Sequence, residues 1–155
     1  MTRLFLACLA ALTLFACGSD SSFTTADIES GTPMGVIAGA PFEYAGAVIE
    51  LRGSELDITL YESEVEDPCS VFGLPDGNVV LFNVPATVGE YPLNFDFSGD
   101  TQTVTLVEAP ANNLIATEGI IDVEAMSDTE ATIGLIAQSG DSYVNGRFTA
   151  SICPN

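Results

Sequence analysis

The chain has 155 residues, of which 22 are acidic, three are arginine or lysine and none is histidine, so its formal net charge is −19. Such a charge repels phosphate groups and argues against a nucleic-acid partner. The chain also lacks histidine and lysine, which are the usual bases of serine and cysteine hydrolases, and this argues against that class of enzyme. With 47% hydrophobic residues the chain can still bury a core, and its length fits one domain.

The first 16 residues have the layout of an export signal. Arg3 precedes an apolar segment from Leu4 to Ala16, and small residues stand before the expected cleavage point. This segment is shorter than the 20 or so residues that a membrane-spanning helix needs. We therefore expect residues 1–16 to be a signal peptide that is removed on export.

The tetrapeptide Leu14-Phe15-Ala16-Cys17 resembles the lipobox of bacterial lipoproteins. The resemblance implies that a diacylglyceryl group is attached to the Cys17 thiol, that cleavage occurs before Cys17 and that its new amino group is acylated, with palmitate-like chains as the anchor. Two or three acyl chains hold a protein durably on a membrane. Cys8 follows a similar tripeptide, but only four apolar residues precede it. The alternative is that Cys17 lies near the cleavage point by chance.

Residues 17–33 are mostly small, polar or acidic and predict a flexible linker between the lipidated cysteine and a domain at 34–155. The Gly18-Ser19 pair differs from the aspartate that favours inner-membrane retention in enteric lipoproteins. By that resemblance the protein is expected in the cell envelope, with the outer membrane preferred over the inner membrane.

From Met34 onward, apolar and polar residues alternate and turn sequences recur about every ten residues, which is typical of β-strands. This pattern predicts an all-β domain, an antiparallel β-sandwich of about nine strands, with a small closed β-barrel as the alternative. The expected strands are Met34 to Ala38, Phe42 to Leu51, Glu55 to Tyr61, Asn78 to Val84, Tyr91 to Phe97, Gln102 to Glu108, Gly119 to Met126, Thr132 to Gln138 and Tyr143 to Ile152.

An acidic segment breaks this alternation after Leu60. The face that carries Leu56, Ile58 and Leu60 would continue as glutamates, so we expect either that the strand ends near Tyr61 or that a bulge turns Tyr61 and Val65 towards the protein. One hypothesis is a solvated acidic edge that blocks strand pairing. The other is a calcium site, because calcium binds six to eight oxygens, with the candidate ligands Glu62, Glu64, Glu66 and Asp67.

Removal of Cys8 with the signal and lipidation of Cys17 leave Cys69 and Cys153 as the remaining thiols. In an oxidising compartment we expect them to form a disulfide, with Cys153 in phase with the polar side chains of its strand and therefore outside the central core. The alternative is two free cysteines, although neither has a basic neighbour to lower its pKa.

The stretches GVIAGAPFEYAG, EDPC, GEY, GIIDV and VNGRFTASIC together resemble a group of uncharacterised secreted bacterial lipoproteins with small all-β domains, to which no activity is assigned. We expect a monomeric, non-catalytic interaction or envelope-structural module with a cationic or envelope protein partner. A lipocalin-like carrier of an apolar small molecule and a calcium-binding surface module are the alternatives.

Overall fold

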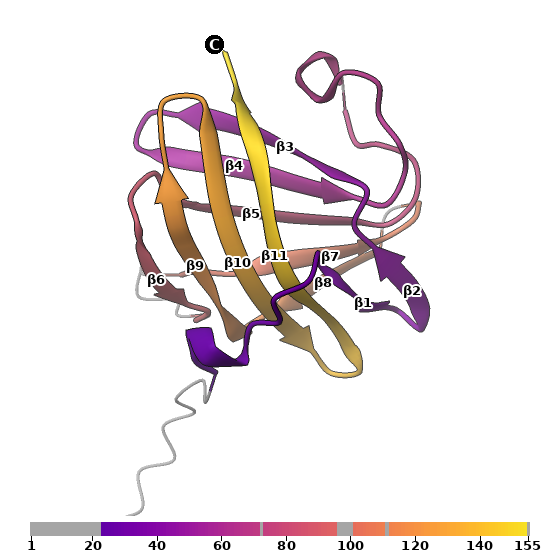
Figure 1. Cartoon of the computed structure of the whole chain (residues 1–155). Helices are drawn as coiled ribbons and strands as arrows, with labels where there is room; N and C mark the ends of the chain where they lie inside the picture. Colours follow the sequence, from indigo (N-terminus) through magenta and orange to yellow (C-terminus); the bar gives the residue numbers. More distant parts are fainter. Residues whose placement is uncertain (1–22, 72, 96–100, 111, 155) are drawn as a thin grey trace, which may run out of the picture.

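The computed structural model describes residues 23–71, 73–95, 101–110 and 112–154, and over these ranges the chain is almost entirely β (Figure 1). The only helical elements in these ranges are two single-turn 3-10 helices, η1 and η2. The elements in chain order are η1 (Thr25–Asp27), β1 (Met34–Ile37), β2 (Ala40–Glu43), β3 (Gly46–Arg52), β4 (Glu55–Tyr61), η2 (Pro68–Ser70), β5 (Val79–Pro85), β6 (Gly89–Pro92), β7 (Val104–Glu108), β8 (Asn112–Ala116), β9 (Glu118–Met126), β10 (Glu130–Ser139) and β11 (Ser142–Cys153).

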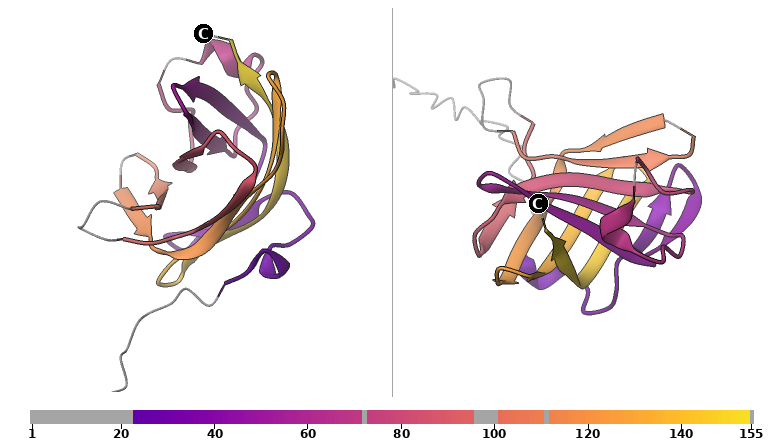
Figure 2. Two further views of the ribbon diagram at one scale, coloured as in Figure 1. Left: turned by 90° about the vertical axis from the view of Figure 1, so that its left-hand side faces the viewer. Right: turned by 90° about the horizontal axis from the view of Figure 1, so that it is seen from above.

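The strands form one curled sheet in the order β6-β9-β10-β11-β3-β4-β5-β7-β8, and the β1–β2 hairpin joins it through β11. Seen along the sheet, these strands trace a half-barrel (Figure 2). The predicted all-β fold is confirmed. The strand pairs are antiparallel except at one place, where the end of the 12-residue strand β11 runs parallel to β3 and pairs Ile152 with Ile49.

The main core fills the concave side of the half-barrel. Alternate residues of β4 supply Leu56, Ile58 and Leu60, each at most 2% exposed, and β10 supplies Ile133 and Leu135 from the facing part of the sheet. This alternation is what a strand with one buried face requires, since successive side chains point to opposite sides. The opposite side of β3, β4 and β5 is therefore the outer face of the sheet.

The strand boundaries differ from those expected in three places. The single strand expected from Phe42 to Leu51 is two strands, because the chain turns between β2 and β3. The strand expected from Tyr91 to Phe97 is shorter, since β6 ends at Pro92 and Asn94 makes only an isolated bridge to Gln102. β8 was not predicted at all, so the described residues contain eleven strands where about nine were expected.

The linker predicted at residues 17–33 is wrong for its second half. Residues 17–22 lie outside the described residues, whereas Thr24–Pro33, which we name the strap, packs on the outer side of β9, β10 and β11. Ile28 is only 4% exposed, and the Gly31 carbonyl accepts a hydrogen bond from the Arg147 amide at 2.7 Å. The strap is therefore part of the folded domain.

Two side chains of β11 hold the strap in place. The Arg147 guanidinium donates to the carbonyls of Thr25, Ile28 and Glu29, and it forms an ion pair with a carboxylate of β9, that of Glu124. The Asn145 amide donates to the Asp27 carbonyl at 3.1 Å and accepts from the Glu29 amide at 2.9 Å. Backbone groups that a free linker would leave to water are thus bound by the domain.

Two glycines allow the strap to lie this close. At Gly146, which has a φ of 151°, an added Cβ would stand 2.6 Å from the Pro33 Cα, a separation that real side chains do not reach. At Gly134, on the neighbouring strand, an added Cβ would meet the Ile28 Cδ1 at 3.1 Å. Close backbone approach is one of the common reasons for a glycine inside a strand.

Candidate functional site

The predicted lipidation site, Cys17, lies outside the described residues, and so do all of residues 1–16. Within the described ranges, no helix has the length and apolar character needed to cross a membrane.

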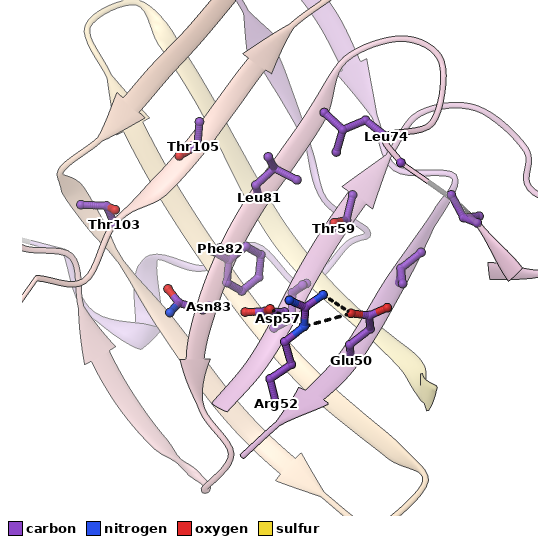
Figure 3. A pocket seen from close by; sticks show the side chains of 14 residues that line it. Glu50, Arg52, Asp57, Thr59, Leu74, Leu81, Phe82, Asn83, Thr103 and Thr105 are labelled. Carbon is purple, nitrogen blue, oxygen red and sulfur yellow. Dashed lines mark hydrogen bonds and ion pairs between the residues drawn. The ribbon is translucent and has the colours of Figure 1, made fainter. Parts of the chain in front are cut away.

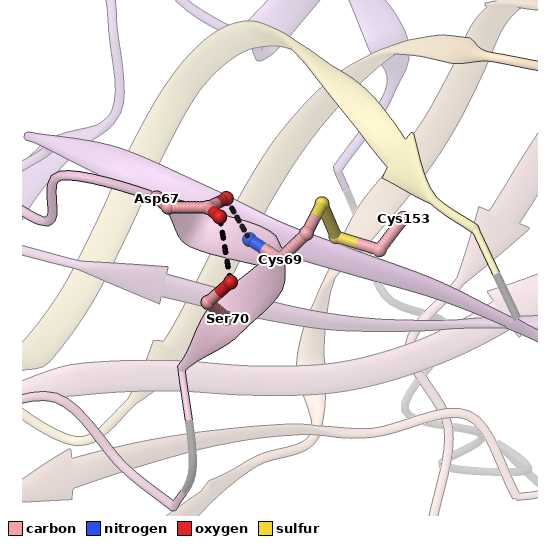
Figure 4. The surroundings of a disulfide bond; sticks show 4 residues. All are labelled: Asp67, Cys69, Ser70 and Cys153. Atoms are coloured by element: carbon pink, nitrogen blue, oxygen red, sulfur yellow. Dashed lines mark hydrogen bonds between the residues drawn. A yellow bond between two sulfur atoms is a disulfide. The ribbon is translucent and has the colours of Figure 1, made fainter.

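The expected disulfide is present between Cys69 and Cys153, whose Cα atoms are 5.3 Å apart (Figure 4). Cys153 is the last residue of β11 and lies opposite Glu50 of β3, so the bridge stands on the outer face at the end of the sheet, away from the main core. It fastens the long β4–β5 loop, residues 62–78, to the end of the sheet. The prediction that this bridge lies outside the central core is confirmed.

The four calcium candidates do not form a ligand set. The Glu62 carboxylate accepts the Asn78 amide at 2.8 Å, which ties the two ends of the β4–β5 loop together. Asp67 caps η2 by accepting from the Cys69 amide at 3.1 Å and from the Ser70 hydroxyl at 2.6 Å (Figure 4). Glu64 and Glu66 are exposed. In the described part of the chain no three acidic or cysteine side chains gather as metal ligands.

A second, smaller apolar cluster lies beneath the β4–β5 loop on the outer face. Its buried members are Tyr61, Val79 and Val107, and Val65 of the loop packs against them. The strand β4 ends at Tyr61, which is one of the two possibilities expected for the acidic segment. Val65 lies towards the protein, and the neighbouring Glu64 and Glu66 are more exposed. Desolvation by this burial raises the pKa of the Tyr61 phenol.

Beside this cluster the outer face is hollowed into a groove of about 510 Å³, which we name the outer-face groove (Figure 3). Its floor is the polar side of β3, β4, β5 and the start of β7, and Leu74 of the β4–β5 loop stands at its margin, 56% exposed. Because the disulfide fastens this loop, it also helps to hold the margin in position. The lining side chains that face the groove include Val48, Glu50, Arg52, Asp57, Thr59, Leu74, Leu81, Asn83, Thr103 and Thr105.

Three charged side chains form a network at one end of the groove. Glu50 and Asp57 lie directly opposite each other on β3 and β4, where two like charges repel. Arg52 lies between them, with its Nη2 2.6 Å from a Glu50 oxygen and its Nε 2.9 Å from an Asp57 oxygen. Hydrogen bonding to Glu50, with the charges of both carboxylates, raises the pKa of Arg52. The three groups together keep one net negative charge.

The remaining polar groups of the groove can form hydrogen bonds with a ligand. Thr59, Thr103 and Thr105 offer hydroxyl groups, and Asn83 donates to Glu55 at 3.0 Å. With apolar Val48 and Leu81 between them, these groups can recognise an extended polar chain by shape, hydrogen bonds and charge.

The sequence analysis missed this groove, although a signal for it was present. Glu50, Arg52 and Asp57 all stand on the polar side of the alternation in β3 and β4, so a hairpin in register brings them together. What alternation did not show was that the β4–β5 loop returns over this same face.

The chain matches no protein-family model, and no curated protein and no solved structure is detectably similar to it.

Proposed function

We propose that this protein is an exported, lipid-anchored interaction module of the cell envelope, without catalytic activity, that binds a basic polypeptide segment in the outer-face groove. The anchor is the acylated Cys17, by resemblance to the lipobox. The observation that carries the binding proposal is the Glu50–Arg52–Asp57 network, which leaves a net negative charge in a groove of a strongly acidic chain.

Charge complementarity favours a cationic partner. Loss of residues 1–16 removes Arg3 and no acidic residue, so the formal charge of the chain from Cys17 onward becomes −20. Such a field attracts basic surfaces and speeds their association, and salt weakens the attraction. An arriving guanidinium or ammonium group can take one of the two carboxylates, while Arg52 keeps the other.

The alternatives have less support. A lipocalin-like carrier needs a hollow interior, whereas Ile49, Leu56 and Leu135 pack there with no exposed surface. A calcium module at residues 62–67 lacks a convergent set of oxygens, because Glu62 and Asp67 already bind backbone amides. Catalysis lacks the histidine and lysine bases that acyl transfer usually uses.

The anchor is tested by mass spectrometry of the N-terminal peptide from the protein expressed in a bacterial envelope. We expect a diacylglyceryl-modified, N-acylated Cys17, and we expect Cys17→Ser to abolish the modification. Cys8→Ser is the matched control, because it changes the other cysteine of the N-terminal region and leaves the lipobox intact. A mature protein with an unmodified thiol at Cys17, or with no Cys17 at all, contradicts the anchor.

Groove binding is tested by crosslinking in the native envelope, followed by identification of the captured proteins. Wild type is compared with the double variant Glu50→Gln/Asp57→Asn, which keeps the size of both side chains but removes their charges. The control is Glu118→Gln/Asp141→Asn, which removes two exposed carboxylates on β9 and at the β10–β11 turn. We expect wild type and control to capture the same basic protein and the groove variant to lose about tenfold in affinity, equivalent to about 1.4 kcal/mol.

Salt provides an independent readout. Capture by wild type should weaken as ionic strength rises, since the attraction between exposed charges is screened. Equal capture by the groove variant and the control contradicts the assignment to the groove. Capture of a carbohydrate or an acidic protein, in place of a basic one, contradicts the proposed class of partner.

A further inference from the structure

The floor of the outer-face groove is a regular grid, because β3, β4 and β5 pair in register. Side chains that lie opposite one another on these strands form two rows across the floor, and the rows are two residues apart along each strand. We name them the apolar row, which consists of Val48, Thr59 and Leu81, and the acidic row, which consists of Glu50, Asp57 and Asn83.

The apolar row offers a place for an apolar side chain of a ligand. Val48 and Leu81 stand on either side of Thr59 and are only partly buried, although both pack against the second apolar cluster. Leu74 of the β4–β5 loop adds to this surface, because it is 56% exposed and lies in the part of the groove away from Arg52 (Figure 3). Covering these side chains stabilises a complex, since it removes apolar area from water.

The acidic row adjoins the apolar row at a distance that the strands fix. Glu50 follows Val48 by two residues on β3, and at the rise of an extended strand this places the two side chains about 7 Å apart. Asp57 and Thr59 have the same spacing on β4. An extended ligand chain also has this spacing between residues i and i+2, whose side chains point to one side. A chain that lies along β4 therefore meets both rows when one residue separates its basic and its apolar side chain.

The polar groups of the floor favour an extended ligand over a helical one. Thr59, Thr103 and Thr105 bring hydroxyl groups that both donate and accept hydrogen bonds, and Asn83 brings a side-chain amide. An extended chain has free backbone N–H and C=O groups that can bind them, whereas a helix uses most of these groups internally.

We propose that the outer-face groove recognises an extended segment in which one residue separates a basic side chain from a bulky apolar one. The basic group binds a carboxylate of the acidic row, and the apolar side chain packs against Val48, Leu74 and Leu81. Because Arg52 leaves one net negative charge in its network, a single basic group neutralises that end of the groove. This inference rests on the proposed binding of a basic segment, to which it adds an apolar anchor and a spacing.

Fluorescence anisotropy with short labelled peptides tests the spacing. Each peptide carries one arginine and one leucine among glycines and serines, and the full chain, purified in detergent, is titrated into it. The spaced peptides contain Arg-Ser-Leu or Leu-Ser-Arg, since a ligand can run in either direction along β4. In the adjacent peptide arginine and leucine are neighbours, so their side chains point to opposite sides of an extended chain. We expect the better of the spaced peptides to bind about tenfold more tightly than the adjacent peptide.

Leu74→Ser tests the apolar anchor and leaves the acidic row untouched. We expect it to weaken binding of the spaced peptide several-fold and to leave unchanged the binding of a reference peptide in which serine replaces the leucine. Val88→Ser is the matched control, because Val88 is also a well-exposed apolar side chain, at 64%, and is not part of the groove lining. This control should bind all the peptides as the wild type does.

Equal affinity for the spaced and adjacent peptides, or equal effects of Leu74→Ser and Val88→Ser, overturns the inference. Failure of the proposed function gives a different result, in which the leucine-free reference peptide binds wild type and Glu50→Gln/Asp57→Asn with the same affinity. If that peptide depends on the two carboxylates and the spacing has no effect, the groove binds basic segments but the proposed spacing is wrong.

Discussion

The strap makes a specific prediction about Arg147. Replacement by methionine keeps most of the apolar stem and removes the guanidinium that donates to three strap carbonyls, those of Thr25, Ile28 and Glu29. Hydrogen bonds to a charged group contribute about 1.5–3 kcal/mol each, which sets an upper limit of about 4.5–9 kcal/mol for the three. The Arg147 side chain is 28% exposed, and water can bind the freed carbonyls, so the realised loss is smaller.

We expect Arg147→Met to lower the free energy of strap docking by about 2–4 kcal/mol, which corresponds to an increase of about 30- to 1,000-fold in the opening of the strap. Hydrogen exchange measures this opening directly, because a locally opened segment exchanges without global unfolding. The amide of Glu29, which donates to Asn145, is the probe. The amides of β4 should keep their protection, since that strand pairs with β3 and β5 and the strap is held by side chains of β11.

Arg52→Met is the matched control, because it removes the other arginine of the folded domain. The Arg52 side chain is 67% exposed and its two ion pairs are at the surface, where ion pairs contribute little to stability, so we expect no change at the Glu29 amide. Equal effects of the two substitutions on Glu29 exchange would refute the assignment of Arg147 as the residue that holds the strap.

Three further predictions follow from other contacts. Gly146→Ala should lower Tm by more than Gly39→Ala, because both positions have a positive φ but an added methyl group at Gly146 meets the strap backbone, whereas at Gly39 it meets open space. Joint replacement of Cys69 and Cys153 by serine should cost about 4–5 kcal/mol and about 15 °C in Tm, because the bridge closes a separation of 84 residues; an unchanged thermal melt contradicts this. Burial, and then the charges of Glu124 and Glu90, raise the pKa of Asp122, so ionisation of this carboxyl group opposes folding. Asp122→Asn should therefore raise Tm by about 1–4 °C at pH 7. The gain should disappear below about pH 4, where the Asp122 carboxyl of the wild type is protonated in the folded and the unfolded state, and thermal melts across this pH range measure it.

Alternation predicted the strands that have one clearly buried face. Leu56, Ile58 and Leu60 show why, since all three are buried by the main core and the polar residues between them face outwards. The same argument failed for β8, whose residues Asn112 to Leu114 are partly or fully exposed on both sides. A strand at the edge of the sheet needs no apolar face, so its sequence carries no such pattern.

The strap was predicted as a linker because its composition is that of a linker. Small, polar and acidic residues predominate from Thr24 to Pro33, and its buried residues are Ile28 and Pro33. What orders the segment is a set of backbone groups bound by Arg147, about 120 residues further along the chain. Hydrogen bonds to backbone carbonyls place no demand on the residue type that supplies the carbonyl, so the strap sequence itself does not record them.

The groove was unpredicted for a related reason. The end of β4 at Tyr61 could be inferred, because the apolar face cannot continue into a row of glutamates. The path of the loop after Tyr61 depends on the bridge between Cys69 and Cys153, and its effect on the groove depends on which face of the sheet the bridge occupies. Sequence phase placed Cys153 on the polar face, but it did not show that Glu50 would lie opposite it.

The domain therefore carries two ties with separate consequences. Arg147 binds the strap where the chain leaves the domain, and the Cys69–Cys153 bridge fastens the loop beside the groove at the other end (Figures 1 and 4). Arg147 and Asn145 hold the strap, whereas Cys69 and Cys153 form the bridge, so the two ties use different side chains. Because sites without shared partners usually act additively, loss of one tie should leave the other intact.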